Sequence, residues 1–430
     1  MPATKIGQFY LFCCLILLLT TQAACVDQSP LPTLAAPLLL PQSDDSAAIA
    51  FAVPPTFTPP GPTATIDPLL NFADNSPLGP TRTPTVTPIL PSRTPTPTHT
   101  PTPTPTPTET PIPSATPIGS GPLPPYLQGD PNRSKLSIHV IFNNDPRIMT
   151  FVRQAQPAVI KGVDDLGFLA DVEKESPNTI IIGRRNWAGQ EYVGNPEEEA
   201  RKFVQAQLRQ YQLNPAVDFW EGWNEPDPGL DRMAWYARFE QERVRELARY
   251  GFRAAVGGFA TGVPEMDEFA LFIPAIETAM QYGGILSLHE YSAPVMTFGY
   301  GGALPGYPFH ADRGSLTFRY RWYYEELLIP RGLVIPLVIS EAGIDGILGN
   351  RPGPEGLGWA DFQQYAVQEG WGSTGDEAFI NQLAWYDAGV RQDDYVLGFT
   401  VFTAGPVAQW GPYDIGPLLP KLADYVRRQE

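Results

Sequence analysis

Eight short apolar runs, separated by longer amphipathic segments, constrain the fold of this chain more than any other feature. Each run is β-branched or continuously apolar, as expected of a strand that is buried on both faces. The runs are LSIHVIF (136–142), AVIKGV (158–163), NTIIIGR (178–184), VDFWEGW (217–223), RAAVGGF (253–259), ILSLHEY (285–291), PLVISEA (336–342) and VLGFTVF (396–402). A chain that alternates strand and helix in this way builds parallel strands joined by helices.

The segments between the runs carry helix signals. Asn195 is a good N-cap residue and Pro196 suits the first helical position, which predicts a helix over about 195–212. A second amphipathic helix is predicted over about 231–250, and Gly251 can end it in a left-handed conformation. Eight such repeats predict a single (β/α)8 TIM barrel over residues 131–430. An open doubly wound sheet is the competing fold, and the lack of a glycine-rich phosphate loop favours the barrel.

The first 25 residues have the pattern of an export signal. One lysine precedes an apolar run over residues 9–19 that is too short for a comfortable membrane span. Residues 22–25, Gln-Ala-Ala-Cys, resemble a bacterial lipoprotein box in which Cys25 would be lipidated. An ordinary cleaved signal or an uncleaved anchor are the alternatives. We therefore expect an exported protein, either secreted or held at the cell surface, that meets the membrane only through a lipid on Cys25.

Residues 26–130 are predicted to be a disordered Pro/Thr-rich stalk. Residues 94–111 read TPTPTHTPTPTPTPTETP, and most of the 49 prolines precede residue 126. Proline removes backbone donors and favours an extended polyproline II conformation, so this region cannot build a packed core. The predicted role is a semi-rigid spacer in front of the barrel.

Composition narrows the range of partners. The net charge of −17 argues against nucleic-acid binding, which normally needs a basic patch. All three cysteines lie within the first 25 residues, and the four histidines form no pairs at helical spacing. We found no Walker, GxGxxG, CxxC or HExxH pattern. We expect no metal and no organic cofactor, and a monomer.

Two glutamates fall at the ends of predicted strands. Glu225 follows the fourth run in WEGWNEP, where Pro226 stops the strand, and Glu341 ends the seventh run in LVISEAG. The carboxyl ends of barrel strands share one face, so the two carboxyl groups should meet there. Hydrolysis of a glycosidic bond needs two such groups, a protonated carboxyl that gives its proton to the leaving oxygen and an ionised carboxylate that attacks the anomeric carbon.

These motifs resemble the glycoside hydrolases of clan A. The resemblance implies that Glu225 is the acid/base, that Glu341 is the nucleophile and that Asn224 hydrogen-bonds the sugar 2-hydroxyl. His-x-Tyr at strand six matches residues 289–291, which implies that Tyr291 hydrogen-bonds the nucleophile. The other substrate-binding candidates that the motifs give are His289, Arg184, Trp223 and, beyond strand eight, Trp410.

The motifs assign no role to three nearby residues, Arg185, Glu221 and Glu290. The clan has an arginine near the nucleophile, and either Arg184 or Arg185 can supply it. Glu290 is a further acid beside the predicted site, and Glu221 points to the same side of its strand as Glu225.

The sequence thus predicts an exported retaining glycosidase that cleaves β-linked polysaccharide or oligosaccharide by double displacement. Two alternatives stay open. One is a non-catalytic carbohydrate-binding module on a degenerate barrel, and the other is a transglycosylase that uses the same residues.

Overall fold

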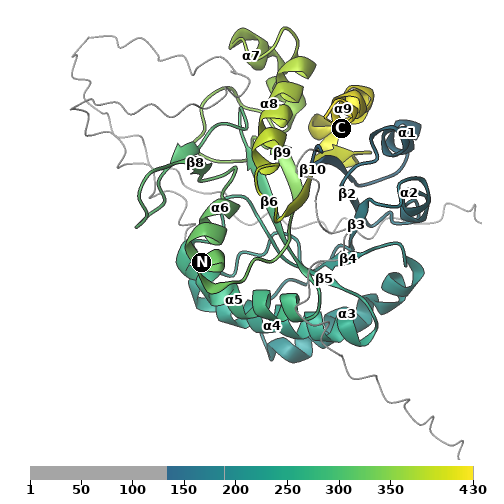
Figure 1. Ribbon diagram of the computed structural model, residues 1–430, viewed down its shortest axis with the longest axis vertical. Helices are drawn as coiled ribbons and strands as arrows, with labels where there is room; N and C mark the ends of the chain where they lie inside the picture. The colour runs from purple at the N-terminus through teal and green to yellow at the C-terminus, as the bar shows by residue number, and fades with distance from the viewer. Residues whose placement is uncertain (1–132, 188, 430) are drawn as a thin grey trace, which may run out of the picture. The chain divides into compact units, whose positions relative to one another are not determined.

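The computed structural model describes residues 133–187 and 189–429. The predicted signal segment and stalk lie outside this part of the chain. Eight parallel strands close into a barrel in the order β1-β10-β9-β6-β5-β4-β3-β2, so the predicted (β/α)8 fold is confirmed (Figure 1). The barrel strands are β1 (Leu136–Val140), β2 (Val159–Val163), β3 (Ile180–Arg184), β4 (Phe219–Glu221), β5 (Ala254–Phe259), β6 (Ile285–Ser292), β9 (Leu337–Ile344) and β10 (Val396–Ala404).

Helices fill the connections on the outside of the barrel. Figure 1 shows α3, α4 and α5 side by side along the wall of β3 to β5, and α9 beside α1. The helices of four or more residues are α1 (Pro146–Ala155), α2 (Leu169–Glu175), α3 (Pro196–Leu213), α4 (Gly229–Arg249), α5 (Met266–Gln281), a π-helix at Tyr323–Leu328, a 3-10 helix at Trp359–Phe362, α7 (Gln363–Gln368), α8 (Gly375–Val390), a 3-10 helix at Ala408–Tyr413 and α9 (Leu419–Arg427). Three-residue turns complete the set at α6 (Tyr320–Trp322), Ile329–Arg331 and Gly416–Leu418. Within the described residues, none of these helices combines the length and apolarity needed to cross a lipid bilayer.

The two predicted helices are confirmed at their caps. The Asn195 side chain accepts a hydrogen bond from the backbone N–H of Glu198, which satisfies one free donor of the first turn of α3. Gly251 follows α4 with a φ of +81°, a value that glycine adopts without steric cost. The long connection after β6 contains an antiparallel hairpin that the sequence did not predict, formed by β7 (Tyr300–Gly302) and β8 (His310–Gly314).

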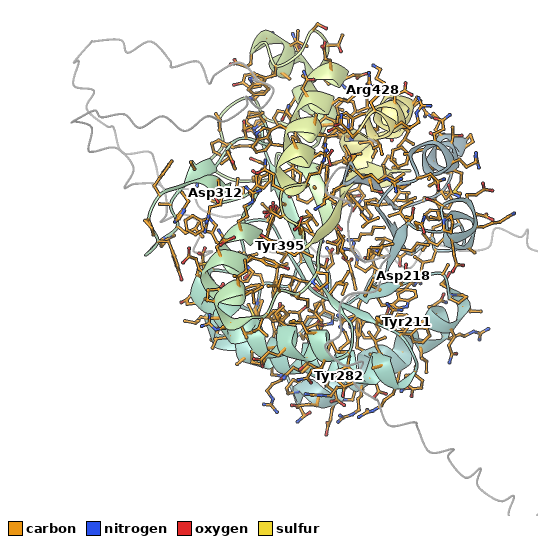
Figure 2. The ribbon with its side chains drawn as sticks, viewed as in Figure 1. Tyr211, Asp218, Tyr282, Asp312, Tyr395 and Arg428 are labelled. Atoms are coloured by element: carbon orange, nitrogen blue, oxygen red, sulfur yellow. The ribbon has the colours of Figure 1, made fainter. Side chains whose placement is uncertain are left out.

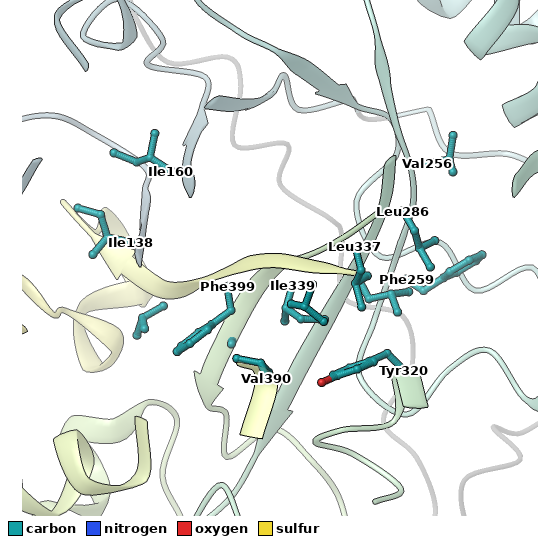
Figure 3. Packing of buried hydrophobic residues seen from close by; sticks show 14 of the residues in the cluster. Ile138, Ile160, Val256, Phe259, Leu286, Tyr320, Leu337, Ile339, Val390 and Phe399 are labelled. Carbon is teal, nitrogen blue, oxygen red and sulfur yellow. The ribbon is translucent and has the colours of Figure 1, made fainter. Parts of the chain in front are cut away.

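Apolar side chains lie on both faces of the barrel wall. Inside, one cluster fills the end where the strands begin; its members are Val159, Ile180, Ile182, Phe219, Ala255, Ile285, Val338 and Leu397. Outside, Ile339 and Phe399 of neighbouring strands lie with Val390 of α8 (Figure 3). This core closes one end of the barrel, so polar side chains can gather only at the other.

Side chains also tie β4 to its surroundings. The Asp218 carboxylate accepts a hydrogen bond of 2.9 Å from the Ile181 backbone N–H, and the Tyr211 ring of α3 lies 4.5 Å from the Trp220 ring; Figure 2 labels Asp218 and Tyr211. The β4 ladder ends at Glu221 and not at the predicted Trp223. A Cβ on Gly222 would come within 2.9 Å of the buried Arg243 guanidinium, so the chain passes there without a side chain.

A bulge in β9 fixes the direction of the acid at its end. Ile339 pairs with Leu288 of β6, but the next β6 residue, His289, pairs with Glu341. The register against β10 shifts at the same place, so Ser340 is one extra residue relative to both neighbours. Because of this residue, Ser340 and Glu341 both reach partners inside the barrel.

Candidate active site

The two predicted carboxyl groups meet at the carboxyl end of the barrel. One carboxylate oxygen of Glu225, one of Glu341 and a ring nitrogen of His289 all lie within 4.8 Å of one another. His289 Nδ1 lies 2.9 Å from Glu225 Oε1 and 3.5 Å from Glu341 Oε2. The structure therefore brings together residues from three strands that are far apart in the sequence.

Glu341 is surrounded by donors. Its Oε1 receives hydrogen bonds of 2.9 Å from both Arg184 Nη1 and Lys161 Nζ, and its Oε2 receives one of 2.9 Å from the Tyr291 hydroxyl. Burial alone would raise the pKa of Glu341, but His289, Lys161 and Arg184 outweigh it and hold that pKa well below the ordinary value. Glu341 is thus an ionised carboxylate in a position that is only 5% exposed.

Glu225, unlike the buried Glu341, is partly exposed to solvent. Its side chain is 39% exposed, and its backbone N–H donates to the Gly258 carbonyl of β5 at 2.9 Å. Its φ is +49°, a left-handed value that is uncommon for a residue with a side chain. Strained backbone of this kind often occurs at functional sites, where the surrounding structure holds it in place.

Asn224 is fixed on both its side chain and its backbone. Its Oδ1 accepts a short hydrogen bond from Arg184 Nη1. The Gln190 amide lies 3.0 and 3.1 Å from the Asn224 backbone O and N, and it satisfies both when its nitrogen faces the carbonyl. Arg184 therefore links Asn224 to Glu341.

The structure separates the two arginines after β3. Arg184 is buried and contacts Glu341, whereas Arg185 turns outward to Asp164, which it meets at 3.2 Å. The alternation of side chains along a strand accounts for the difference. Arg184 is accordingly the arginine beside the predicted nucleophile.

The two candidate tryptophans lie in different places. Trp410 is partly buried, with its ring 5.2 Å from that of Phe402, in the small aromatic cluster that contains Tyr291. Trp223 is buried against α4, with its ring 4.7 Å from that of Phe239 and 5.7 Å from that of Tyr236. Trp410 is thus near the carboxylate pair, whereas Trp223 packs behind β4 and is not brought to the pair.

Glu290 points away from the site although both of its neighbours face it. Its carboxylate accepts hydrogen bonds from the backbone N–H groups of Phe318 and Tyr320, at 2.6 and 3.0 Å, and from the Tyr386 hydroxyl at 2.6 Å. Burial raises the pKa of Glu290 to about 7, against the effect of these donors. Glu290 therefore joins β6 to the helices outside the barrel.

Sequence reasoning missed several polar residues in the barrel interior. Lys161, in the apolar run of β2, contacts both Glu341 and Glu221. His139 of β1 is buried, and neither of its ring nitrogens has a hydrogen-bond partner among the described residues. Burial holds the pKa of His139 well below the ordinary value. A charged or imidazole side chain inside a strand that is buried on both faces was the signal that could have identified them.

Glu225, His289 and Glu341 are also the one set in the described part of the chain whose spacing could hold a metal ion. However, Lys161 and Arg184 both donate to Glu341 Oε1, so a divalent cation there would face two positive charges already in place. The arrangement suits proton transfer and nucleophilic attack better than metal binding.

No family model and no curated protein matches the chain. Similar solved structures include an endo-β-1,4-glucanase from Xanthomonas axonopodis pv. citri, with 13% identity and a TM-score of 0.39, covering 69% of this chain and 99% of that one. Another is an endo-1,4-β-D-mannanase from Thermotoga petrophila, with 11% identity and a TM-score of 0.37, covering 68% and 99%. These neighbours are glycoside hydrolases, the class that the sequence motifs resemble. The roles of the site residues rest on the geometry of this chain.

Proposed function

We propose that this chain is a retaining glycoside hydrolase that acts on β-linked polysaccharide or oligosaccharide. The observation that carries the proposal is the pair Glu225 and Glu341, with carboxylate oxygens within 4.8 Å of each other at the carboxyl end of a (β/α)8 barrel. Retaining glycosidases hold their two carboxyl groups about 5–5.5 Å apart, whereas inverting enzymes need about 6.5–9.5 Å to admit a water molecule.

In the proposed reaction Glu341 attacks the anomeric carbon while Glu225 gives its proton to the departing glycosidic oxygen. A glycosyl ester forms on Glu341, and the bond from the anomeric carbon to the leaving oxygen breaks. Glu225 then takes a proton from water, which attacks the same carbon and releases Glu341. The low pKa of Glu341 supports its role as the attacking anion, and the greater exposure of Glu225 gives it access to substrate and water.

Two other candidates, Asn224 and Trp410, bind the sugar in this proposal. Asn224, held by Arg184, is placed beside both carboxyl groups to hydrogen-bond the sugar 2-hydroxyl. Trp410, close to Tyr291 and Phe402, offers an aromatic surface for the apolar face of a sugar ring. The export pattern of residues 1–25 and the stalk that follows suit an enzyme that works outside the cell, tethered through Cys25.

Covalent trapping tests the proposal. The full chain would be incubated with a panel of 2-deoxy-2-fluoro β-glycosides, and the labelled peptide would be identified by mass spectrometry. We expect the label on Glu341, and none in Glu341→Gln. Glu225→Gln should lower turnover of an unactivated substrate roughly 10²–10⁴-fold, the usual contribution of general acid/base catalysis.

A label on another residue would overturn the assignment of the nucleophile. A folded protein that binds glycans but takes no label and turns over no glycoside would support the binding-module alternative. Products formed with an added sugar acceptor would identify a transglycosylase.

A further inference from the structure

Lys161 is a fully buried cation beneath the proposed nucleophile. It lies in β2, and none of its side chain is exposed to solvent. Its Nζ lies 2.9 Å from Glu341 Oε1, 2.9 Å from Glu221 Oε2 and 3.3 Å from Ser340 Oγ. Nζ donates hydrogen bonds to Glu341 Oε1 and Ser340 Oγ, whereas its contact with Glu221 Oε2 is an ion pair without hydrogen-bond geometry.

The neighbouring contacts fix the direction of the hydrogen bonds. The Ser287 hydroxyl donates to Glu221 Oε1 at 2.7 Å. Ser287 Oγ also donates to Ser340 Oγ, which lies 2.8 Å away, so its single proton is shared between Glu221 Oε1 and Ser340 Oγ. Ser340 Oγ is then an acceptor for Lys161. Lys161, Glu221, Ser287 and Ser340 thus form a closed ring of side-chain contacts beside Glu341.

Charges around Glu341 are balanced inside the barrel. Two cations, Lys161 and Arg184, face two carboxylates, Glu341 and Glu221. Burial would raise the pKa of Glu221, but Lys161 and Arg184 outweigh it and lower that pKa to about 2. Lys161 is therefore shared between two anions and is not bound to Glu341 alone.

We propose that Lys161 and Glu221 form a positioning pair that fixes Glu341 for attack through Oε2. Both charged donors bind Oε1, whereas Oε2 receives a neutral hydroxyl from Tyr291 and faces His289. Oε1 thus accepts two hydrogen bonds and Oε2 accepts one, so Oε2 is the oxygen with an electron pair left for attack. This inference rests on the proposed function, and it adds a role for residues that do not touch the substrate.

The pair accounts for the change of charge during the reaction. The Oε2–carbon bond forms, the bond to the leaving oxygen breaks, and the proton of Glu225 goes to that oxygen. Glu341 loses its charge as Glu225 gains one, so the net charge of the site stays the same. Glu221 remains as the counter-ion of Lys161 while the ester exists, so that the ammonium is never buried without an anion.

The test compares the pH dependence of kcat/KM for wild type, Lys161→Met and Glu221→Gln on one activated aryl glycoside. The acid limb reports the ionisation of the nucleophile in the free enzyme. Because Lys161→Met removes a cation, its acid limb should move to higher pH by about one unit or more. Its kcat should fall roughly 10–100-fold. Removing an anion in Glu221→Gln should lower kcat without raising the limb.

Lys135 provides a matched control. It is also a buried lysine, but its Nζ donates to the Val390 and Asp393 carbonyls outside the site. Lys135→Met should leave the acid limb in place. If Lys161→Met folds poorly because it leaves Glu221 alone, the double variant with Glu221→Gln removes both charges together, and its acid limb should lie between those of the single variants.

Two failures can be told apart. Wild type that takes the fluoroglycoside label on Glu341, with an acid limb in Lys161→Met that matches Lys135→Met, would overturn the inference and leave the proposed function standing. Wild type with neither label nor turnover would overturn the proposed function, and the inference with it.

Discussion

The chemistry of each acid at the site follows from the direction of its side chain. Along β6 the side chains alternate, so His289 and Tyr291 face the carboxylate pair while Glu290 faces the helices. The pair Glu225 and Glu341 was predictable because both residues follow strands whose carboxyl ends share one face of the barrel, whereas the role of Glu290 was not predicted. The partners of Lys161 could not be predicted, because they lie on strands that only barrel closure brings near it.

The same alternation predicts unequal roles for the two arginines after β3. Arg184→Ala removes a charged hydrogen bond to buried Glu341, a contact worth about 1.5–3 kcal/mol, so we expect kcat/KM to fall roughly 10–150-fold. Arg185→Ala breaks a surface ion pair with Asp164 and should change kcat/KM less than about twofold. Steady-state kinetics on one substrate would check both values. Equal losses in the two folded variants would contradict the assignment of Arg184.

At the scale of elements, the presence of each strand was easier to predict than its end. All eight predicted strands are present, because long apolar runs are stable only where both of their faces are buried. The β4 ladder stops just before Gly222, which lies against Arg243 of α4, and the β7–β8 hairpin pairs residues within a long connection. Neither contact leaves a local pattern in the sequence.

The link between β6 and the helices outside the barrel should depend on pH. Because the pKa of Glu290 is raised from 4.5 to about 7, the folded chain holds this proton more tightly than the unfolded chain. The stability that Glu290 contributes is therefore complete below about pH 4.5 and is lost as the pH rises through 7.

We expect Glu290→Gln to change less in melting temperature between pH 5 and pH 8 than wild type does, as measured by thermal unfolding. Glu277→Gln, at an exposed position of α5, is the matched control and should behave like wild type. An unchanged pH dependence in Glu290→Gln would show that this carboxyl group does not titrate in that range.

At the scale of the whole molecule, closure joins the first strand to the last. β1 pairs with β10, and beside this seam the Lys135 backbone N–H donates to the Asp387 carboxylate of α8 at 2.7 Å. The buried apolar clusters run from Leu136 to Val426. Strand count and order predicted this closure, but not the polar contacts that accompany it.

A fragment of residues 126–430 should consequently fold on its own. We expect one cooperative thermal transition, within about 2 °C of the main transition of the full chain, because all eight barrel strands and the buried apolar clusters described above lie between residues 136 and 426. Calorimetry of the fragment and of the full chain at equal concentration would measure both melting temperatures. A fragment that melts much earlier would show that the preceding segment stabilises the barrel.

The bulge at Ser340 has a consequence for how this site can be altered. The extra residue lets two consecutive side chains of β9, Ser340 and Glu341, face the barrel interior, whereas a regular strand would present only one of them there. Removing Ser340 would leave Glu341 directly after the outward-facing Ile339, so the carboxylate would keep its inward direction, but the hydroxyl that contacts Lys161 and Ser287 would be lost. A barrel whose strand has no bulge could therefore receive the carboxylate alone but not the hydroxyl next to it, so transferring both groups requires transferring the extra residue as well.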